Sequence, residues 1–304
     1  ALGGIPLAGP LAAFAPIRAA FATSGAFDVQ SKVGKVSGAA NLSYRVNNNV
    51  MVYTSYSRGN RSGGLNLTQL ATGISPVVAP ESIDAYEVGL KTSLLDNRVT
   101  FNVAGYLQND RNYQANVADP TRLAVVYLSN VPKVRSKGIE IDMQGRLSDN
   151  FSVYGALAYT DAKIVSYPAS ACPLELTNLN TCDLSGYAIA GIPKWSASFG
   201  GEVKQPVTVF DAQSEAYLGF DYSYRSEVNN GGYSAATLLE PLHLVNARLG
   251  VRAANHRIDA SLWVKNLFDK QYLSDVAVGT GNTGLLTAQL GDPRTYGVTL
   301  RFHF

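Results

Sequence analysis

Long segments in which apolar and polar residues alternate recur along this chain, and they constrain its fold more than any other feature. One example has Ile258, Ala260, Leu262 and Val264 on one side and Asp259, Ser261, Trp263 and Lys265 on the other. A period of two is typical of a β-strand, because successive side chains point to opposite faces. Each two-faced strand needs neighbours, so the pattern predicts a large sheet.

Eleven segments follow this rule, and each is long enough to cross a bilayer as a tilted strand. We therefore predict an all-β fold, a transmembrane antiparallel β-barrel or part of one. The predicted strands are about 32–46, 49–58, 81–95, 97–116, 122–147, 149–163, 193–205, 213–227, 239–253, 256–268 and 290–304.

The connections between the predicted strands are alternately short and long. Short turns rich in Asn and Asp are at 47–49, 96–97, 148–150 and 253–256, and long polar connections are at 59–80, 164–192, 228–238 and 269–289. The connection at 204–213 is longer than its short-turn position predicts. All short turns thus lie at one end of the sheet, as in outer-membrane barrels.

Composition favours strands over membrane helices. Charged residues make up 16% of the chain and mean hydropathy is zero, yet no apolar stretch reaches the length of about 18 residues expected of a membrane helix. A soluble β-sandwich is the alternative, but sandwich strands usually have about five or six residues, roughly half the length seen here. The net charge of +2 and the scattered basic residues give no reason to expect a nucleic-acid partner.

Residues 1–31 contain none of these strands, and we expect an external loop or irregular segment before the barrel strands of 32–304. The stretch IPLAGPLAAFAPI at 5–17 contains three prolines and follows no basic residues, which disfavours a signal-peptide remnant. No initiator Met opens the chain. We therefore expect the sequence to be a piece of something longer.

Five motifs are specific enough to suggest a family. They are NVMVYTSYSRGNRSGGLN at 49–66, ESIDAYEVGLKTSLLDNRVTFNVAGY at 81–106, SKGIEID at 136–142, VKNLFDKQY at 264–272 and TYGVTLRFHF at 295–304. In order and spacing they resemble the C-terminal half of the barrel of TonB-dependent outer-membrane receptors. The resemblance covers residues from about 32 to 304.

This resemblance implies a barrel of about 22 strands, closed by a plug domain, in the outer membrane of a Gram-negative bacterium. The implied function is uptake of a scarce ligand, such as a ferric siderophore, cobalamin or a saccharide, when the TonB complex acts on the plug. Neither a plug nor a TonB-contacting box is found in this sequence, so we expect the last eleven strands of the barrel. The first and last strands run in the same direction and cannot pair antiparallel. We therefore expect a partial barrel, or a twelfth strand recruited from residues 1–31.

The last predicted strand carries an apolar stripe to the end of the chain. The stripe consists of Tyr296, Val298, Leu300, Phe302 and Phe304. Facing lipid would suit this stripe, and its terminal Phe resembles the signal by which barrel-assembly machinery accepts unfolded barrels. An aromatic residue of the interface girdle would occupy the same place, so both roles stay open.

Charged residues on the polar faces of the last strands are expected to contact the plug. They are Arg248, Arg252, Asp259, Lys265 and Arg301. The connections 59–80, 164–192 and 269–289 are better placed for first contact with ligand. The Gly-rich stretch RGNRSGG reads as the root of an external loop, and its Arg58 and Arg61 are candidates for contact with an anionic ligand or lipopolysaccharide.

No motif supports catalysis, a cofactor or a metal site. His243, His256 and His303 lack metal-ligand spacing, and no GxSxG elbow occurs. The alternative to active transport is a passive porin-like or surface-binding barrel. A plug and TonB box upstream would favour transport, whereas a signal peptide directly before the strands would favour the passive barrel.

Cys172 and Cys182 are the only cysteines, and both lie in the connection 164–192. A pair confined to one loop is typical of a disulfide formed in an oxidising compartment. We therefore predict a bond between them, with two unrelated thiols as the alternative.

Overall fold

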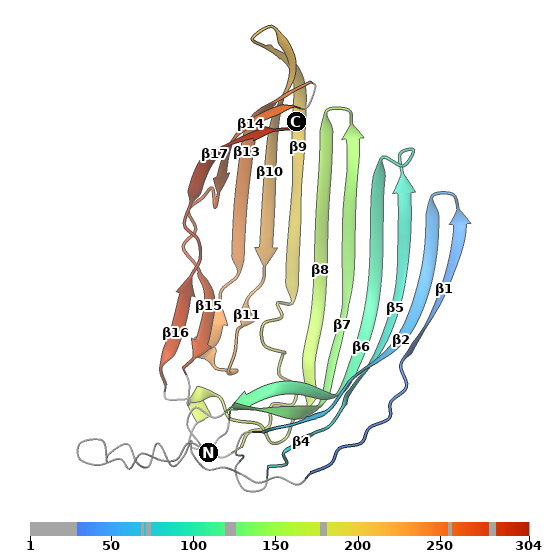
Figure 1. Ribbon diagram of the computed structural model, residues 1–304, viewed down its shortest axis with the longest axis vertical. Coiled ribbons are helices and arrows are strands. Elements are labelled where there is room, and N and C mark those ends of the chain that lie inside the picture. The colour runs from blue at the N-terminus through green and yellow to red at the C-terminus, as the bar shows by residue number, and fades with distance from the viewer. Residues whose placement is uncertain are drawn as a thin grey trace, which may run out of the picture.

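The computed structural model describes residues 29–67, 70, 74–118, 126–176, 181–254, 257–279 and 284–303. Its main feature is one antiparallel sheet of eleven strands that are neighbours in chain order (Figure 1). The strands are β1 (Gly38–Asn47), β2 (Val50–Arg61), β5 (Glu81–Leu94), β6 (Val99–Ala118), β7 (Val126–Ser148), β8 (Phe151–Ser166), β9 (Trp195–Val209), β10 (Ala212–Arg225), β13 (Leu242–Ala253), β14 (Ile258–Lys265) and β17 (Thr295–Phe302). The prediction of an antiparallel all-β fold is confirmed.

The sheet is open and forms a curved wall (Figure 1). β1 and β17 are its two edges and do not pair with each other. Among the described residues no twelfth strand joins the sheet. The expected partial barrel is therefore observed, because two edge strands that run in the same direction cannot complete an antiparallel ladder.

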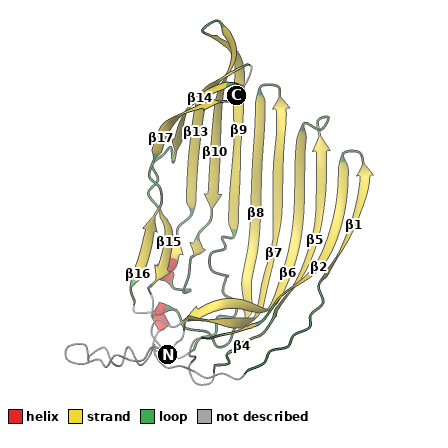
Figure 2. Cartoon of the chain, viewed as in Figure 1, coloured by secondary structure: helices red, strands yellow, loops and turns green. Residues whose placement is uncertain are grey.

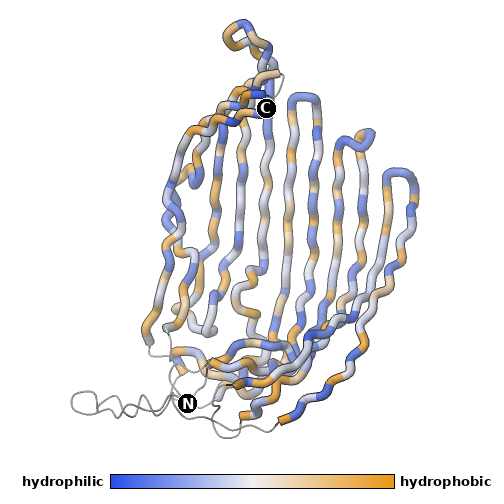
Figure 3. Tube along the Cα trace, in the orientation of Figure 1, coloured by the Kyte–Doolittle hydropathy of each residue, from blue (hydrophilic) through white to orange (hydrophobic). Residues whose placement is uncertain are grey.

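The strand register aligns apolar residues of successive strands on one face. One row crosses the sheet through Val52, Leu90, Val103, Ile141 and Leu157. The row beside it, displaced by one residue, holds polar or small residues, and Figure 3 shows this alternation along each strand. We call the face that contains Leu157 the outer face and the face that contains its neighbour Ala156 the inner face.

The prediction of a long connection at 204–213 was wrong. β9 continues to Val209 and β10 begins at Ala212, so only Phe210 and Asp211 form the turn, both with positive φ. Proline cannot donate to a strand ladder, yet Pro206 lies in this part of β9. It is tolerated there because β9 extends beyond its pairing with β8, which ends at Val203.

The connections at the other end contain small elements of their own, drawn in Figure 2. They are the hairpins β3 (Gly64–Leu65) with β4 (Val77–Val78), β11 (Val228–Asn229) with β12 (Leu238–Leu239) and β15 (Leu273–Val278) with β16 (Leu286–Leu290), and the 3-10 turns η2 (Leu174–Leu176) and η3 (Ala235–Thr237). In the described part of the chain, no helix has the length and hydropathy required to span a membrane.

Candidate functional site

A partly buried ion pair lies on the inner face of β13 and β14. Asp259 is 7% exposed and accepts hydrogen bonds from the Tyr217 hydroxyl at 2.8 Å and from Arg252 Nε at 3.0 Å. The Arg252 guanidinium also lies 4.8 Å from the centre of the Tyr217 ring. Arg252 and Asp259 are direct partners in the strand register, so the sheet itself brings the two charges together.

Glu202 on β9 extends this group to a second arginine. Its carboxylate lies 3.2 Å from Arg248 Nη2 and 3.9 Å from Arg252 Nη1. Arg248 Nη1 lies 3.9 Å from Asp221, and Asp221 accepts a hydrogen bond from the Tyr154 hydroxyl. The two arginines are thus compensated by carboxylates of the wall itself. We call the seven residues the inner-face network: Tyr154, Glu202, Tyr217, Asp221, Arg248, Arg252 and Asp259.

The structure divides the residues predicted to contact a plug into two groups. Arg248, Arg252 and Asp259 belong to the inner-face network. Lys265 instead lies 5.7 Å from the centre of the Trp263 ring, and Arg301 is opposite Asp259 in the register of β14 and β17. Among the described residues, neither Lys265 nor Arg301 has a carboxylate within salt-bridge distance. Of the five predicted residues, these two are therefore the ones without a salt bridge inside the described part of the wall.

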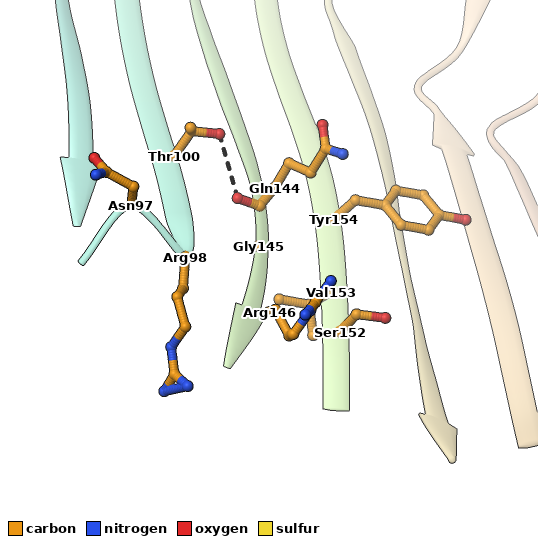
Figure 4. A pocket seen from close by; sticks show the side chains of 9 residues that line it. All are labelled: Asn97, Arg98, Thr100, Gln144, Gly145, Arg146, Ser152, Val153 and Tyr154. Atoms are coloured by element: carbon orange, nitrogen blue, oxygen red, sulfur yellow. Dashed lines mark hydrogen bonds between the residues drawn. The ribbon is translucent and has the colours of Figure 1, made fainter. Parts of the chain in front are cut away.

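A polar hollow of about 900 Å³ lies at the short-turn ends of β6, β7 and β8 (Figure 4). Its lining includes the inner-face side chains Arg98, Thr100, Gln144, Arg146, Ser152 and Tyr154. The Thr100 hydroxyl donates to the Gln144 carbonyl at 3.2 Å. The lining therefore offers hydrogen-bonding groups to a polar partner.

The long connections pack on one another through apolar side chains. One buried cluster contains Val131, Val134, Ile164, Tyr167 and Leu184 and joins the ends of β7 and β8 to the connection that follows β8. A second cluster of Val228, Leu239 and Val276 joins the β11–β12 hairpin to β15. Sequence reasoning missed both clusters. Val131, Val134 and Leu239 fall inside the predicted strands 122–147 and 239–253, and the other members are isolated apolar residues in the connections, where no periodicity marks them.

Cys172 and Cys182 form a disulfide with their Cα atoms 5.0 Å apart. Between them, the Glu175 carboxylate accepts hydrogen bonds from Ser234 Oγ at 2.7 Å and from the Ala235 amide at 2.9 Å. The Ser234 hydrogen bond is the main reason why the pKa of Glu175 is lowered. Any stability from this contact is therefore present above the ordinary carboxyl pKa and is lost as pH falls through the lowered one.

Removing the disulfide should loosen this connection. We expect Cys172→Ser to cost about 2–3 kcal/mol of local stability, because the unfolded loop regains conformational entropy. Faster amide hydrogen exchange around Leu184 would report the loss. The intact mass of the unaltered protein should rise by about two hydrogens on reduction. Thiols that react with a maleimide in non-reduced outer membranes would contradict the bond.

Arg58 and Arg61 lie on β2 and not in a loop, because β2 continues to Arg61. The predicted strand end at residue 58 was therefore wrong. Glycine and polar residues have low strand propensity, but the ladder with β5 extends as far as the pair Arg61 and Glu81. Arg58 lies on the outer face, 3.7 Å from Asp84.

The remaining predicted site residues add no metal centre. No group of three or more His, Cys, Asp or Glu in the described ranges is arranged to hold a metal ion. His243 Nδ1 is hydrogen-bonded to the Tyr222 hydroxyl at 2.7 Å. His256 and Phe304 lie outside the described residues, as does nearly all of the predicted loop 1–31. Recognition of Phe304 by barrel-assembly machinery therefore stays a prediction.

Comparison with known proteins explains this architecture. Residues 17–300 match the family described as TonB dependent receptor-like, beta-barrel. The chain belongs to this family. Family members are β-barrel proteins of the Gram-negative outer membrane, and the resemblance noted in the sequence is confirmed.

Individual relatives share the barrel at low identity. The chain is 22% identical to the probable TonB-dependent siderophore receptor PiuA of Acinetobacter baumannii over 84% of this chain and 33% of PiuA. It is 24% identical to the ferric-pyoverdine 358 receptor of Pseudomonas putida over 89% of this chain and 29% of that receptor. The chain thus spans about a third or less of these relatives.

Solved structures show the same fold. The ferric yersiniabactin uptake receptor FyuA of Yersinia pestis aligns with a TM-score of 0.68 at 18% identity, covering 89% of this chain and 37% of FyuA. In this family the short turns face the periplasm and the long loops face outward. The outer face of the wall therefore meets lipid, and the inner face meets the barrel lumen.

Proposed function

We propose that this chain is the C-terminal part of the wall of a receptor that takes up a metal chelate, in the first instance a ferric siderophore, with energy supplied through TonB. Family membership supports the transport class. The names of relatives support the ligand class, since they include receptors for ferric pyoverdine and metal-pseudopaline. The observation that carries the proposal is the match of residues 17–300 to this barrel.

The inner face is where we place the contact with a plug domain. Lys265 and Arg301 supply cations without carboxylate partners among the described residues, and the polar hollow near Thr100 supplies hydrogen-bonding groups. The inner-face network instead keeps this part of the wall in shape. Residues 32–304 would then be the C-terminal barrel segment, with 1–31 an external loop before it.

First contact with ligand is proposed for the external connections after β2, β8 and β14. They lie on the outward-facing end of the wall, the side from which a ligand arrives. The two apolar clusters give these connections a defined shape. A shaped surface costs less ordering entropy on binding than an unstructured one.

The test is uptake by cells that express the receptor from its own gene. Cells with TonB should accumulate iron-55 supplied as ferric siderophores, and cells without TonB should show only background uptake. Cobalamin and a labelled oligosaccharide serve as ligands of other classes. Equal uptake with and without TonB would indicate a passive porin-like barrel, and TonB-dependent uptake of cobalamin alone would overturn the metal-chelate assignment.

A further inference from the structure

A belt of basic side chains crosses the outer face at the level of the external ends of β2 and β8, which is near the middle of the longer β6 and β7. The strand register aligns Arg58, Asp84, Asn109, Arg135 and Lys163 in one row. Lys137 and Asp161 are partners in the row below, and Arg111 and Lys133 are partners in the row above. Along each strand, these rows lie an even number of residues from the row that contains Leu157. The side chains therefore lie on the same outer face, which meets lipid.

The carboxylates of the belt lie beneath its cations. Asp84 lies 3.7 Å from Arg58 and 3.3 Å from Arg111, and its side chain is only 9% exposed, against 41% and 60% for the arginines. Asp161 likewise lies 3.0 Å from Lys163 and 3.9 Å from Lys137. Because each carboxylate is shared by two cations, positive charge remains at the surface.

Two further cations of the belt, Arg135 and Lys133, do not share a carboxylate. Arg135 donates to the neutral Asn109 side chain at 3.1 Å. Neither Arg135 nor Lys133 has a carboxylate within salt-bridge distance among the described residues. The belt therefore presents an excess of exposed donors suited to a phosphate, which arginine and lysine bind through charge-assisted hydrogen bonds.

Directly below the belt, the outer face is aromatic and then apolar. Tyr56 and Tyr86 have ring centres 5.1 Å apart, and Tyr159 and Trp195 have ring centres 4.7 Å apart. Tyrosine and tryptophan collect at the level of lipid headgroups. The belt therefore lies at the headgroup level of the outer leaflet or just above it.

A hollow of about 570 Å³ opens on the outer face beside these rings. Its lining includes Val88, Gly105, Leu107, Ile139 and Tyr159, and Lys137 borders it on the side of the belt. A Cβ atom built on Gly105 would meet only the Gly138 carbonyl, at 3.9 Å, so the absence of a side chain leaves room there. Most of the lining of the hollow is apolar, and the hollow lies directly below Lys137 of the belt.

We propose that this surface binds a phosphorylated glycolipid of the outer leaflet, lipopolysaccharide. Its phosphates would contact the basic belt, and one acyl chain would lie in the hollow at Gly105. The row of Lys137 lies directly above the row of Gly105 and Ile139, about 6.8 Å away along the strand. A lipid phosphate at the first row can therefore be continuous with an acyl chain at the second. The proposal rests on the outer-membrane location of the family and does not depend on which ligand is transported.

The test uses the whole receptor, purified from outer membranes in mild detergent, with retained lipopolysaccharide measured by mass spectrometry. The variant Arg111→Gln/Arg135→Gln/Lys137→Gln removes three cations but leaves Asp84 paired with Arg58 and Asp161 with Lys163. We expect retention to fall about tenfold or more, since each basic residue near a membrane surface contributes to binding of anionic lipid.

The matched control removes the same charge from the inner face, as Arg45→Gln/Lys91→Gln/Arg225→Gln. It should retain lipopolysaccharide like the unaltered receptor. Unchanged retention in the belt variant, or equal loss in the control, would overturn the proposal. Both proteins must keep the gel mobility of a folded barrel, so a folding defect is distinguished from lost binding.

Rebinding to delipidated receptor identifies the source of the phosphate. Lipopolysaccharide should rebind, whereas its dephosphorylated form should not, and inorganic phosphate at equal concentration should not displace it. Displacement by inorganic phosphate would mean a site for free anions and would overturn the lipid assignment. Gly105→Leu, which fills the hollow, should also reduce rebinding. Full rebinding to that variant would overturn the hollow as the place of the acyl chain.

Discussion

Replacing Leu157 by arginine should lower the free energy of unfolding of the receptor by about 1–2 kcal/mol, because Leu157 lies one row below the aromatic residues at headgroup level and the cost of a lipid-facing charge falls from about 2–4 kcal/mol at the bilayer midplane towards the interfaces. Leu157 lies on the outer face of β8, in the apolar row that includes Val103 and Ile141. Its side chain is exposed on the wall, so the loss comes from lipid contact and not from protein packing. The temperature at which the folded band disappears in SDS gels would measure the effect.

Ala156→Arg is the matched control, because Ala156 is the next residue and points to the opposite face. It is also exposed, and its partner on β7 is Asp142, which favours a new cation. We expect a much smaller loss. Equal losses from the two variants would contradict the assignment of the outer face to lipid.

Asp259→Ala should be the second large effect, with a cost of about 2–3 kcal/mol. The change leaves the Tyr217 hydroxyl without its acceptor and Arg252 with only the longer contact of 3.9 Å to Glu202. Arg252 is 29% exposed, so solvent screens part of the loss and the full penalty of a buried charge does not apply. Thermal unfolding of the folded band should shift down by roughly 1–4 °C.

Asp149→Ala is the control, because it removes a carboxylate that is exposed to solvent instead of buried. The Asp149 side chain is 93% exposed and lies 3.9 Å from Arg98. Pairs of this type contribute about 0–1 kcal/mol, so the unfolding temperature should hardly change. If Asp259→Ala had as small an effect as Asp149→Ala, the inner-face network would not stabilise the wall.

The sequence alone determined the fold class, the number of strands in the main sheet and the outward and inward faces of those strands. These features depend on a period of two, which is local and survives any error in strand ends, as in 256–268 against the observed Ile258–Lys265. Strand ends were predicted less well. Pro206 and the Gly-rich stretch after Arg58 look locally like breaks, yet pairing with β10 and β5 carries both strands further.

Only the tertiary structure decided which charges meet. Arg252 and Asp259 were chosen from the sequence as two separate lumen residues, but the register makes them one pair and adds Glu202 from another hairpin. The basic belt is a similar case, because Arg58 and Lys163 are far apart in sequence and come to lie in one row only through the alignment of β2, β5, β6, β7 and β8. Periodicity fixes the face on which a side chain lies, whereas its neighbours depend on the pairing of whole strands.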